Sequence, residues 1–315
     1  GTPTSFTITV NPTATVNAVA NQVVCNNAPT TAVNFSSPTT GGTIVYNWTN
    51  NTPSIGLAAA GTGNISSFTA TNATNAPVIA TITVTPSYTN GGTTCVGIPL
   101  SFTITVNPFA TVNTVANQVV CNNAPTAAVT FSSPTTGGTI VYNWTNNTPS
   151  IGLAASGTGN IPSFTATNAG NAPVTATITV TPTYTNGVSC VGTPTTFTIT
   201  VNPTAVVNPV TDVVLCNGAV STPISFSSPT TGGTIVYNWT NSLPSIGLAA
   251  SGTGTIPSFT AVNLSNAPVV ATITVTPTYT NGVSCVGTPL TFTITVNPPP
   301  VINPVANQTL CNNSP

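Results

Sequence analysis

A near-identical block of 95 or 96 residues recurs three times along the 315-residue chain. The string PTTGGTIVYNWTN starts at Pro38, Pro134 and Pro229, so its starts are 96 and 95 residues apart (134 − 38 and 229 − 134). Solenoid repeats are much shorter, roughly 20–50 residues each, whereas a block of this length is enough for a complete small β-sandwich. The repeat therefore predicts an array of similar domains joined end to end.

The repeat also predicts the domain boundaries. Residues 1–10 match the end of each block, and residues 301–315 match its beginning. The expected division is the last strand of a preceding repeat at 1–11, complete repeats at 12–107, 108–202 and 203–297, and the first strand of a following repeat at 298–315. The complete repeats are called unit 1, unit 2 and unit 3. We expect the natural chain to continue in both directions.

Each unit shows the residue pattern of β-strands. Apolar residues alternate with threonine or asparagine at 44–49, 81–85 and 101–106 of unit 1. One apolar face and one polar face are typical of half-buried strands in antiparallel sheets. Shorter apolar segments at 33–35 and 68–70 predict two further strands, and no segment has the pattern of an amphipathic helix. The predicted fold class is all-β: a tandem array of Ig-like antiparallel β-sandwich domains.

The composition excludes several classes of function. The chain has no Lys, Arg or His, and Asp212 is its one acidic residue. General acid–base catalysis needs a tunable His, Lys or pair of carboxylates, and nucleic-acid binding needs Lys and Arg. No enzyme activity, cofactor, metal site or nucleic-acid partner is therefore predicted. Asp212 replaces the asparagine found at about the same place in units 1 and 2, so no catalytic role is assigned to it.

The same composition argues against disorder and against membrane insertion. The chain is 40% hydrophobic with a mean hydropathy of +0.33, whereas disordered chains are poor in apolar residues. Thr, Asn, Pro and Gly interrupt every apolar run before it reaches the length of a membrane helix. Without charge, repulsion between copies is weak, so the further expectation is either self-association into filaments or a rod protected by attached sugar.

Several recurring strings resemble a known family. They are YNWT, IGLAAxGTG, SFTATN, PVxATITVTP and CxGTPxTFTITVNP, and together they are similar to the PKD-like (Ig-like) repeats of very large Bacteroidota surface adhesins. The gliding-motility adhesins exported by the type IX secretion route are one such group. The resemblance covers essentially the whole chain. It implies an Ig-like fold and an extracellular or cell-surface stalk or fibre, although the near absence of charge departs from the family pattern.

The cysteines are the candidate site residues. Two of them recur in each unit, which fits disulfides in an oxidising, extracellular setting, whereas the lack of His and of any CxxC pair argues against metal binding. The candidates are Cys25, Cys95, Cys121, Cys190, Cys216, Cys285 and Cys311.

Two connectivities remain open. In an Ig-like topology the two cysteines of one unit lie at opposite ends of the sandwich, about 25–30 Å apart by strand rise, whereas a disulfide needs Cα atoms within about 7 Å. Pairing across the junctions between units avoids this distance and gives Cys25–Cys190 and Cys121–Cys285. The alternative is pairing within units, which gives Cys25–Cys95, Cys121–Cys190 and Cys216–Cys285.

The tryptophans and the linkers complete the predictions. Trp48, Trp144 and Trp239 are interpreted as core residues rather than sugar-stacking platforms, with partners Val33, Ile82 and Ile104 for the first of them. Each unit ends in Asn-Pro, and the next apolar run follows at once, which predicts a stiff rod that grows by about 40 Å per unit.

The leading functional interpretation is a structural stalk or filament that holds a distal adhesive tip away from the cell. Neighbouring repeats are the expected partners, together with a possible glycan or surface ligand at that tip. The alternative is a binding module in which the recurrent loop at 50–54 contacts a glycan or a surface. An Asn-Asn-Thr-Pro-Ser turn explains that loop equally well.

Overall fold

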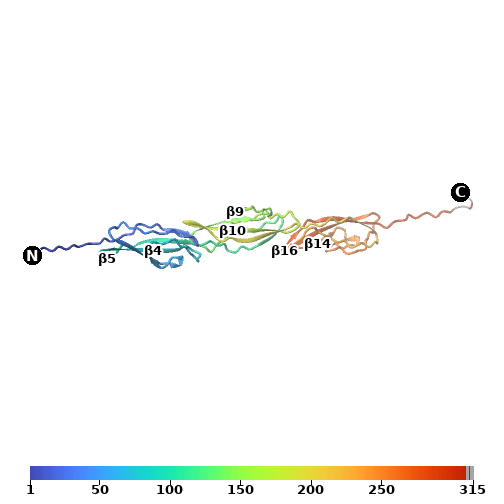
Figure 1. Ribbon diagram of the computed structural model, residues 1–315. Helices are drawn as coiled ribbons and strands as arrows, with labels where there is room; N and C mark the ends of the chain where they lie inside the picture. The colour runs from blue at the N-terminus through green and yellow to red at the C-terminus, as the bar shows by residue number, and fades with distance from the viewer. Residues whose placement is uncertain (310–311, 313–315) are drawn as a thin grey trace.

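The computed structural model describes residues 1–309 and 312, and it consists of strands, turns and three single-turn 3₁₀ helices. Three similar units follow one another in a line, with the two ends of the chain extending from opposite ends of the line (Figure 1). This arrangement confirms the predicted fold class, an all-β tandem array of Ig-like domains.

Each unit contains one six-stranded sheet, which forms one layer of the sandwich. In unit 1 it contains β1 (Gln22–Cys25), β2 (Thr43–Asn50), β3 (Ala60–Thr62), β4 (Val78–Asn90), β5 (Thr93–Val96) and β6 (Leu100–Asn107). The strand order is β1-β6-β4-β2-β3. The short strand β5 pairs with the C-terminal end of β4, beyond the part of β4 that pairs with β6. A 3₁₀ helix, Pro53–Ile55, lies between β2 and β3.

Units 2 and 3 repeat this sheet. Unit 2 contains β7 (Gln118–Cys121), β8 (Thr139–Asn146), β9 (Ser156–Thr158), β10 (Val174–Asn186), β11 (Val188–Val191) and β12 (Thr195–Asn202). Unit 3 contains β13 (Val213–Cys216), β14 (Thr234–Asn241), β15 (Ser251–Thr253), β16 (Val269–Asn281), β17 (Val283–Val286) and β18 (Leu290–Asn297). The matching 3₁₀ helices are Pro149–Ile151 and Pro244–Ile246.

The longest strand of each unit organises its sheet. β4 has 13 residues and pairs antiparallel with β2, β5 and β6. Its alternating pattern places Ala80, Ile82 and Val84 in the core and leaves threonines on the outer face. The strands predicted at 44–49, 81–85 and 101–106 are β2, β4 and β6, because the period of two in these segments matches the pleat of a half-buried strand.

The first strand of each unit pairs in parallel with the last. Cys25 at the end of β1 lies opposite Asn107 at the end of β6. A first strand of the repeat was predicted at 298–315, whose counterpart in unit 1 is 12–29, and β1 occupies four of those residues. It pairs with a segment about 80 residues further along the chain. This pairing places Cys25 at the end of unit 1 that faces unit 2.

The second layer of the sandwich is mostly irregular. The segments predicted as strands at 33–35 and 68–70 form single bridges, Val33 with Ile65 and Pro29 with Thr69. In this layer, side chains bond backbone groups that a β-ladder would otherwise pair. For example, the backbone amide of Phe35 donates to Asn64 Oδ1 at 2.9 Å. Pro29 and Pro38 flank the first of these segments and cannot donate backbone hydrogen bonds, which limits a ladder there.

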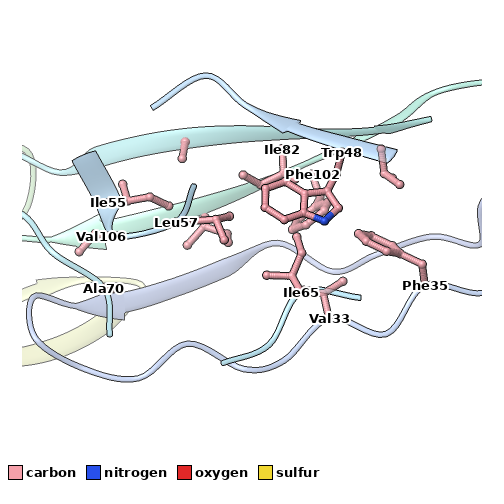
Figure 2. Close-up of a cluster of buried hydrophobic side chains, with 13 residues drawn as sticks. Val33, Phe35, Trp48, Ile55, Leu57, Ile65, Ala70, Ile82, Phe102 and Val106 are labelled. Carbon is pink, nitrogen blue, oxygen red and sulfur yellow. The ribbon is translucent and has the colours of Figure 1, made fainter. Parts of the chain in front are cut away.

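An apolar core lies between the two layers (Figure 2). Trp48 is 7% exposed and belongs to the same buried cluster as Val33, Ile82 and Ile104. The indole ring lies opposite Gly61 of β3, whose missing side chain leaves room for it. Its Nε1 atom is buried and makes no hydrogen bond in the described structure, so the ring packs as an apolar group.

The segments outside the three sheets are exposed. Residues 1–10 form no strand, and Phe6, Ile8 and Val10 are each about four-fifths exposed. Residues 299–309 are likewise exposed and without a strand. None of the described strands pairs with either segment.

Candidate functional site: the junction between units

The described residues offer little chemistry beyond hydrogen bonding and disulfides. They contain no group of three or more His, Cys, Asp or Glu residues that could hold a metal ion. The carboxylate of Asp212 accepts a hydrogen bond from the backbone amide of Thr293 at 2.7 Å. Asn21 makes the same contact with the amide of Thr103 at 2.8 Å, so Asp212 has an ordinary structural role.

The richest cluster of polar groups lies where one unit meets the next. From unit 1 the junction takes the ends of β1 and β6 and the loop 72–77. From unit 2 it takes the turn between β10 and β11, and the loop around Thr136. These segments meet because loop 72–77 leads into β4 at the end of unit 1 where β1 and β6 finish, and β10 carries its turn to the end of unit 2 that faces unit 1.

A disulfide joins the two units. Cys25 of β1 is bonded to Cys190 of β11, with Cα atoms 5.6 Å apart and a sequence separation of 165 residues. Cys121 and Cys285 are bonded in the same way across the next junction, with the same Cα separation of 5.6 Å. Each of these cross-junction bonds is called a staple.

The staples follow from where the sheet places each cysteine. Cys25 lies beside Asn107 at the far end of unit 1, whereas Cys95 pairs with Tyr88 near the opposite end. The length of β4 separates these two positions, which is why the structure has no bond within unit 1. Cys95 is half-buried and Cys216 is exposed, and neither has a disulfide partner among the described residues. Cys311 lies outside the described residues.

Two asparagines face each other beside each staple. Asn107 Nδ2 donates to the backbone oxygen of Asn186 at 2.7 Å, and Asn186 Nδ2 donates to Asn107 Oδ1 at 3.0 Å. This reciprocal pair is called the amide clasp. Asn107 is fully buried, so the clasp satisfies polar groups that water does not reach.

The clasp occurs three times at the same sequence separation of 79 residues. Asn202 and Asn281 form it between units 2 and 3, at 2.8 and 3.1 Å. Asn11 and Asn90 form it at the free end of unit 1, at 3.1 and 3.2 Å. The recurrence shows that the Asn-Pro at the end of each repeat and the Asn-Gly turn of the next form a single joint.

A loop contact closes the other side of the junction. The amide of Thr136 in unit 2 donates to the backbone oxygen of Asn75 in unit 1 at 2.8 Å. Next to it, Gly137 adopts φ +82°, and a Cβ atom there would lie 2.6 Å from Pro77 Cδ. Asn72 holds this loop of unit 1 in place by donating to the oxygen of Val106 at 2.8 Å.

The linker is bound to the following unit. Ala110 is fully buried, and its backbone oxygen accepts a hydrogen bond from the amide of Thr193 at 3.2 Å. The equivalent bond from Thr288 to Ala205 measures 2.8 Å. A covalent bond, a clasp, a loop contact and a docked linker therefore act together at one joint, which restricts hinge motion between units.

The loop proposed as an alternative binding patch serves the fold. Asn51 Oδ1 accepts a hydrogen bond from the amide of Thr81 at 2.8 Å, and Asn50 Nδ2 donates to the oxygen of Leu57 at 2.9 Å. Ile55 anchors the 3₁₀ helix in the core. These contacts account in structural terms for the recurrence of the Asn-Asn-Thr-Pro-Ser string in units 1 and 2. Unit 3 has Asn-Ser-Leu-Pro-Ser at 241–245, where Ser242 Oγ accepts the equivalent hydrogen bond from the amide of Thr272 at 2.8 Å.

Comparison with known proteins gives a likeness of fold. No family model and no curated protein matches the chain. Among solved structures, the I67–I69 fragment of titin is 8% identical over 92% of this chain and 100% of its own, with a TM-score of 0.44. Mouse cadherin-23 EC22–24 is 12% identical over 92% of this chain and 99% of its own, with a TM-score of 0.42. Both are strings of tandem domains, and at these values the likeness says nothing about partner or activity.

Proposed function

We propose that this chain is part of an extracellular structural stalk or filament of a bacterial surface adhesin, without catalytic activity. In this proposal the domains are 12–107, 108–202 and 203–297, and segments 1–11 and 298–315 belong to neighbouring repeats. The array holds a distal ligand-binding part away from the cell surface, and its partners are the repeats on either side.

The observation that carries the proposal is that the two junctions of the chain have the same geometry. The same staple and the same clasp occur between units 1 and 2 and between units 2 and 3. Repeated domains with identical, multiply bonded joints give a defined length for a given number of repeats. Length and straightness are the properties that a stalk requires.

An extracellular location is supported by the disulfides, because such bonds persist in oxidising compartments. A bacterial adhesin of the Bacteroidota type is supported by the recurring sequence strings. Within residues 1–309, no helix has the length and apolar character needed to cross a bilayer.

The lack of charge bears on assembly. With one acidic residue and no basic residue, electrostatic repulsion between neighbouring rods is almost absent. The threonine-rich outer faces of the sheets are also free of charged side chains that discourage association. Side-by-side association of stalks into a filament is therefore part of the proposal, and it should change little with salt.

Small-angle X-ray scattering of the purified chain tests the stalk. The expected particle is a rod with roughly 40 Å per unit, because the 13-residue strand spans each unit at about 3.3 Å per residue. A broad distribution of bent shapes contradicts the proposal. Sedimentation across concentration and salt tests filament formation, and a monomer throughout removes that part.

A glycan array probed with a single unit separates the stalk from the alternative binding module. No binding is expected, because the loop at 50–54 is used by the fold. Specific binding that is lost when Asn51 and Thr52 are both replaced by Ala favours the module instead.

A further inference from the structure

We propose that the staples make the array a tension-bearing cable, in which load passes along a short covalent path and bypasses most of each unit. This function goes beyond holding a tip at a distance. It rests on the staple geometry and holds whatever the stalk binds.

The segment between Cys190 and Cys216 runs in one direction along the array. Cys190 is stapled to the end of unit 1, and β11 and β12 both run antiparallel to β10, away from that junction. The chain then enters unit 3 and ends in β13, where Cys216 lies opposite Asn297 at the far end. These residues therefore cross the whole of units 2 and 3 without turning back.

The segment is almost fully extended. It contains 26 peptide steps (216 − 190), whose greatest possible span is about 85–95 Å. β10 has 13 residues and reaches from Val174, beside the end of β12, to Asn186 at the clasp, so one unit is about 40 Å long. Two units then measure about 80 Å, which leaves roughly a tenth of the length as slack.

The same spacing recurs along the sequence. Cys95 and Cys121 are 26 residues apart (121 − 95), as are Cys285 and Cys311 (311 − 285). A staple followed by such a segment carries the covalent path forward by two units, and the next staple can continue it. Two such paths, offset by one unit, run side by side along a longer array.

The path leaves most of each unit out of the load. In unit 2 the residues between Cys121 and Cys190 contain β8, β9 and β10, which make up the sheet from its central strand β10 to its edge strand β9. Force that enters at Cys190 continues along β12 and need not pass through these strands. An unstapled array, in contrast, lengthens by unfolding each unit in turn.

Single-molecule stretching between two exposed points tests the proposal. The handles are attached to azidohomoalanine, a methionine analogue that is incorporated at the two substituted positions Ala20→Met and Val214→Met. The parent chain has no Met, so these two positions are marked specifically. Both positions are exposed, and each precedes a cysteine of the path. In the oxidised chain the expected result is a steep rise in force near 100 Å (about 29 steps plus the disulfide), with no large unfolding step.

Reduction should release the bypassed residues. The staple joins cysteines 165 residues apart in sequence. In dithiothreitol the distance between the handles is therefore expected to increase by about 550–600 Å, in steps as the released parts of the units unfold. The double variant Cys25→Ser/Cys190→Ser should lengthen by somewhat less, about 470–510 Å, because the remaining Cys121–Cys285 staple shortens the route between the handles from 194 to 172 steps (101 from residue 20 to 121 and 71 from 285 back to 214). The matched double variant Cys121→Ser/Cys285→Ser keeps the staple of this path and should stay short.

Two outcomes overturn the proposal. One is stepwise lengthening of the oxidised parent chain toward the reduced length, and the other is a short extension that persists when the Cys25–Cys190 staple is reduced. Neither outcome depends on adhesion, so a failed stalk and a failed cable remain distinguishable.

Discussion

The amide clasp should contribute measurably to docking between units, and Asn107→Ala tests this. The substitution removes two hydrogen bonds, at 2.7 and 3.0 Å, from a residue with 0% exposure. It also leaves the backbone oxygen and the side-chain amide of Asn186 without their partner. A net hydrogen bond is worth about 1 kcal/mol and a buried unsatisfied group costs about 1–3 kcal/mol, so the expected loss is about 2–4 kcal/mol.

The assay is urea unfolding under reducing conditions, followed by the fluorescence of the three tryptophans, one in each unit. Reduction removes the staples, so the clasp is measured without covalent help. In a repeat array the free energy of unfolding includes a term for each interface between neighbours, and the substitution should lower the term for one junction alone.

Asn297→Ala is the matched control. Asn297 ends β18 as Asn107 ends β6, and its backbone oxygen accepts a hydrogen bond from Asn217, but among the described residues its side chain has no clasp partner. Its replacement should change stability by no more than about 0.5 kcal/mol. The double variant Asn107→Ala/Asn186→Ala should be little worse than either single one. Equal losses at Asn107 and Asn297, or additive losses in the double variant, would refute the reasoning.

Three further predictions follow from the same structure. Gly137→Ala should destabilise the chain by about 1–3 kcal/mol more than Gly41→Ala in urea unfolding, because both glycines have φ above +80° but only Gly137 faces a neighbouring unit. Trp144→Ala should cost about 3–5 kcal/mol as a core residue, whereas a loss below about 0.5 kcal/mol would point to a surface platform. Burial raises the pKa of Tyr184 and Tyr279 above 10.0, so the folded state holds these protons more tightly than the unfolded state. Thermal stability should therefore be flat from about pH 5 to 9 and fall above about pH 10, and a fall beginning near neutral pH contradicts this.

Much of the fold could be predicted because its strands are strongly periodic. The alternation around Trp48 and Ile82 identified β2 and β4, and the repeat identified the tandem arrangement. The irregular second layer could not be predicted, because the choice between a ladder and side-chain bonds such as Asn64 to Phe35 depends on tertiary contacts.

The junction was less accessible from sequence. The cysteines left two connectivities open: the expected Ig-like topology placed Cys25 and Cys95 at opposite ends of a unit, but an error of one strand in that assignment would have allowed a bond within the unit. The clasp had a signal that was overlooked: Asn-Pro and Asn-Gly recur in every repeat, 79 residues apart in each clasp. Recurrence alone does not show which of these residues are in contact. Asn-Pro and Asn-Gly are common turn sequences, so each is also explained as a turn within its own unit.

The most direct test of the stapled array is mass-spectrometric mapping of the unreduced chain. Chymotrypsin suits the digestion, since the chain has no Lys or Arg for trypsin. The account predicts linked peptides that join Cys25 to Cys190 and Cys121 to Cys285. Peptides that join Cys25 to Cys95 would contradict it, because they would place both cysteines at one end of a unit.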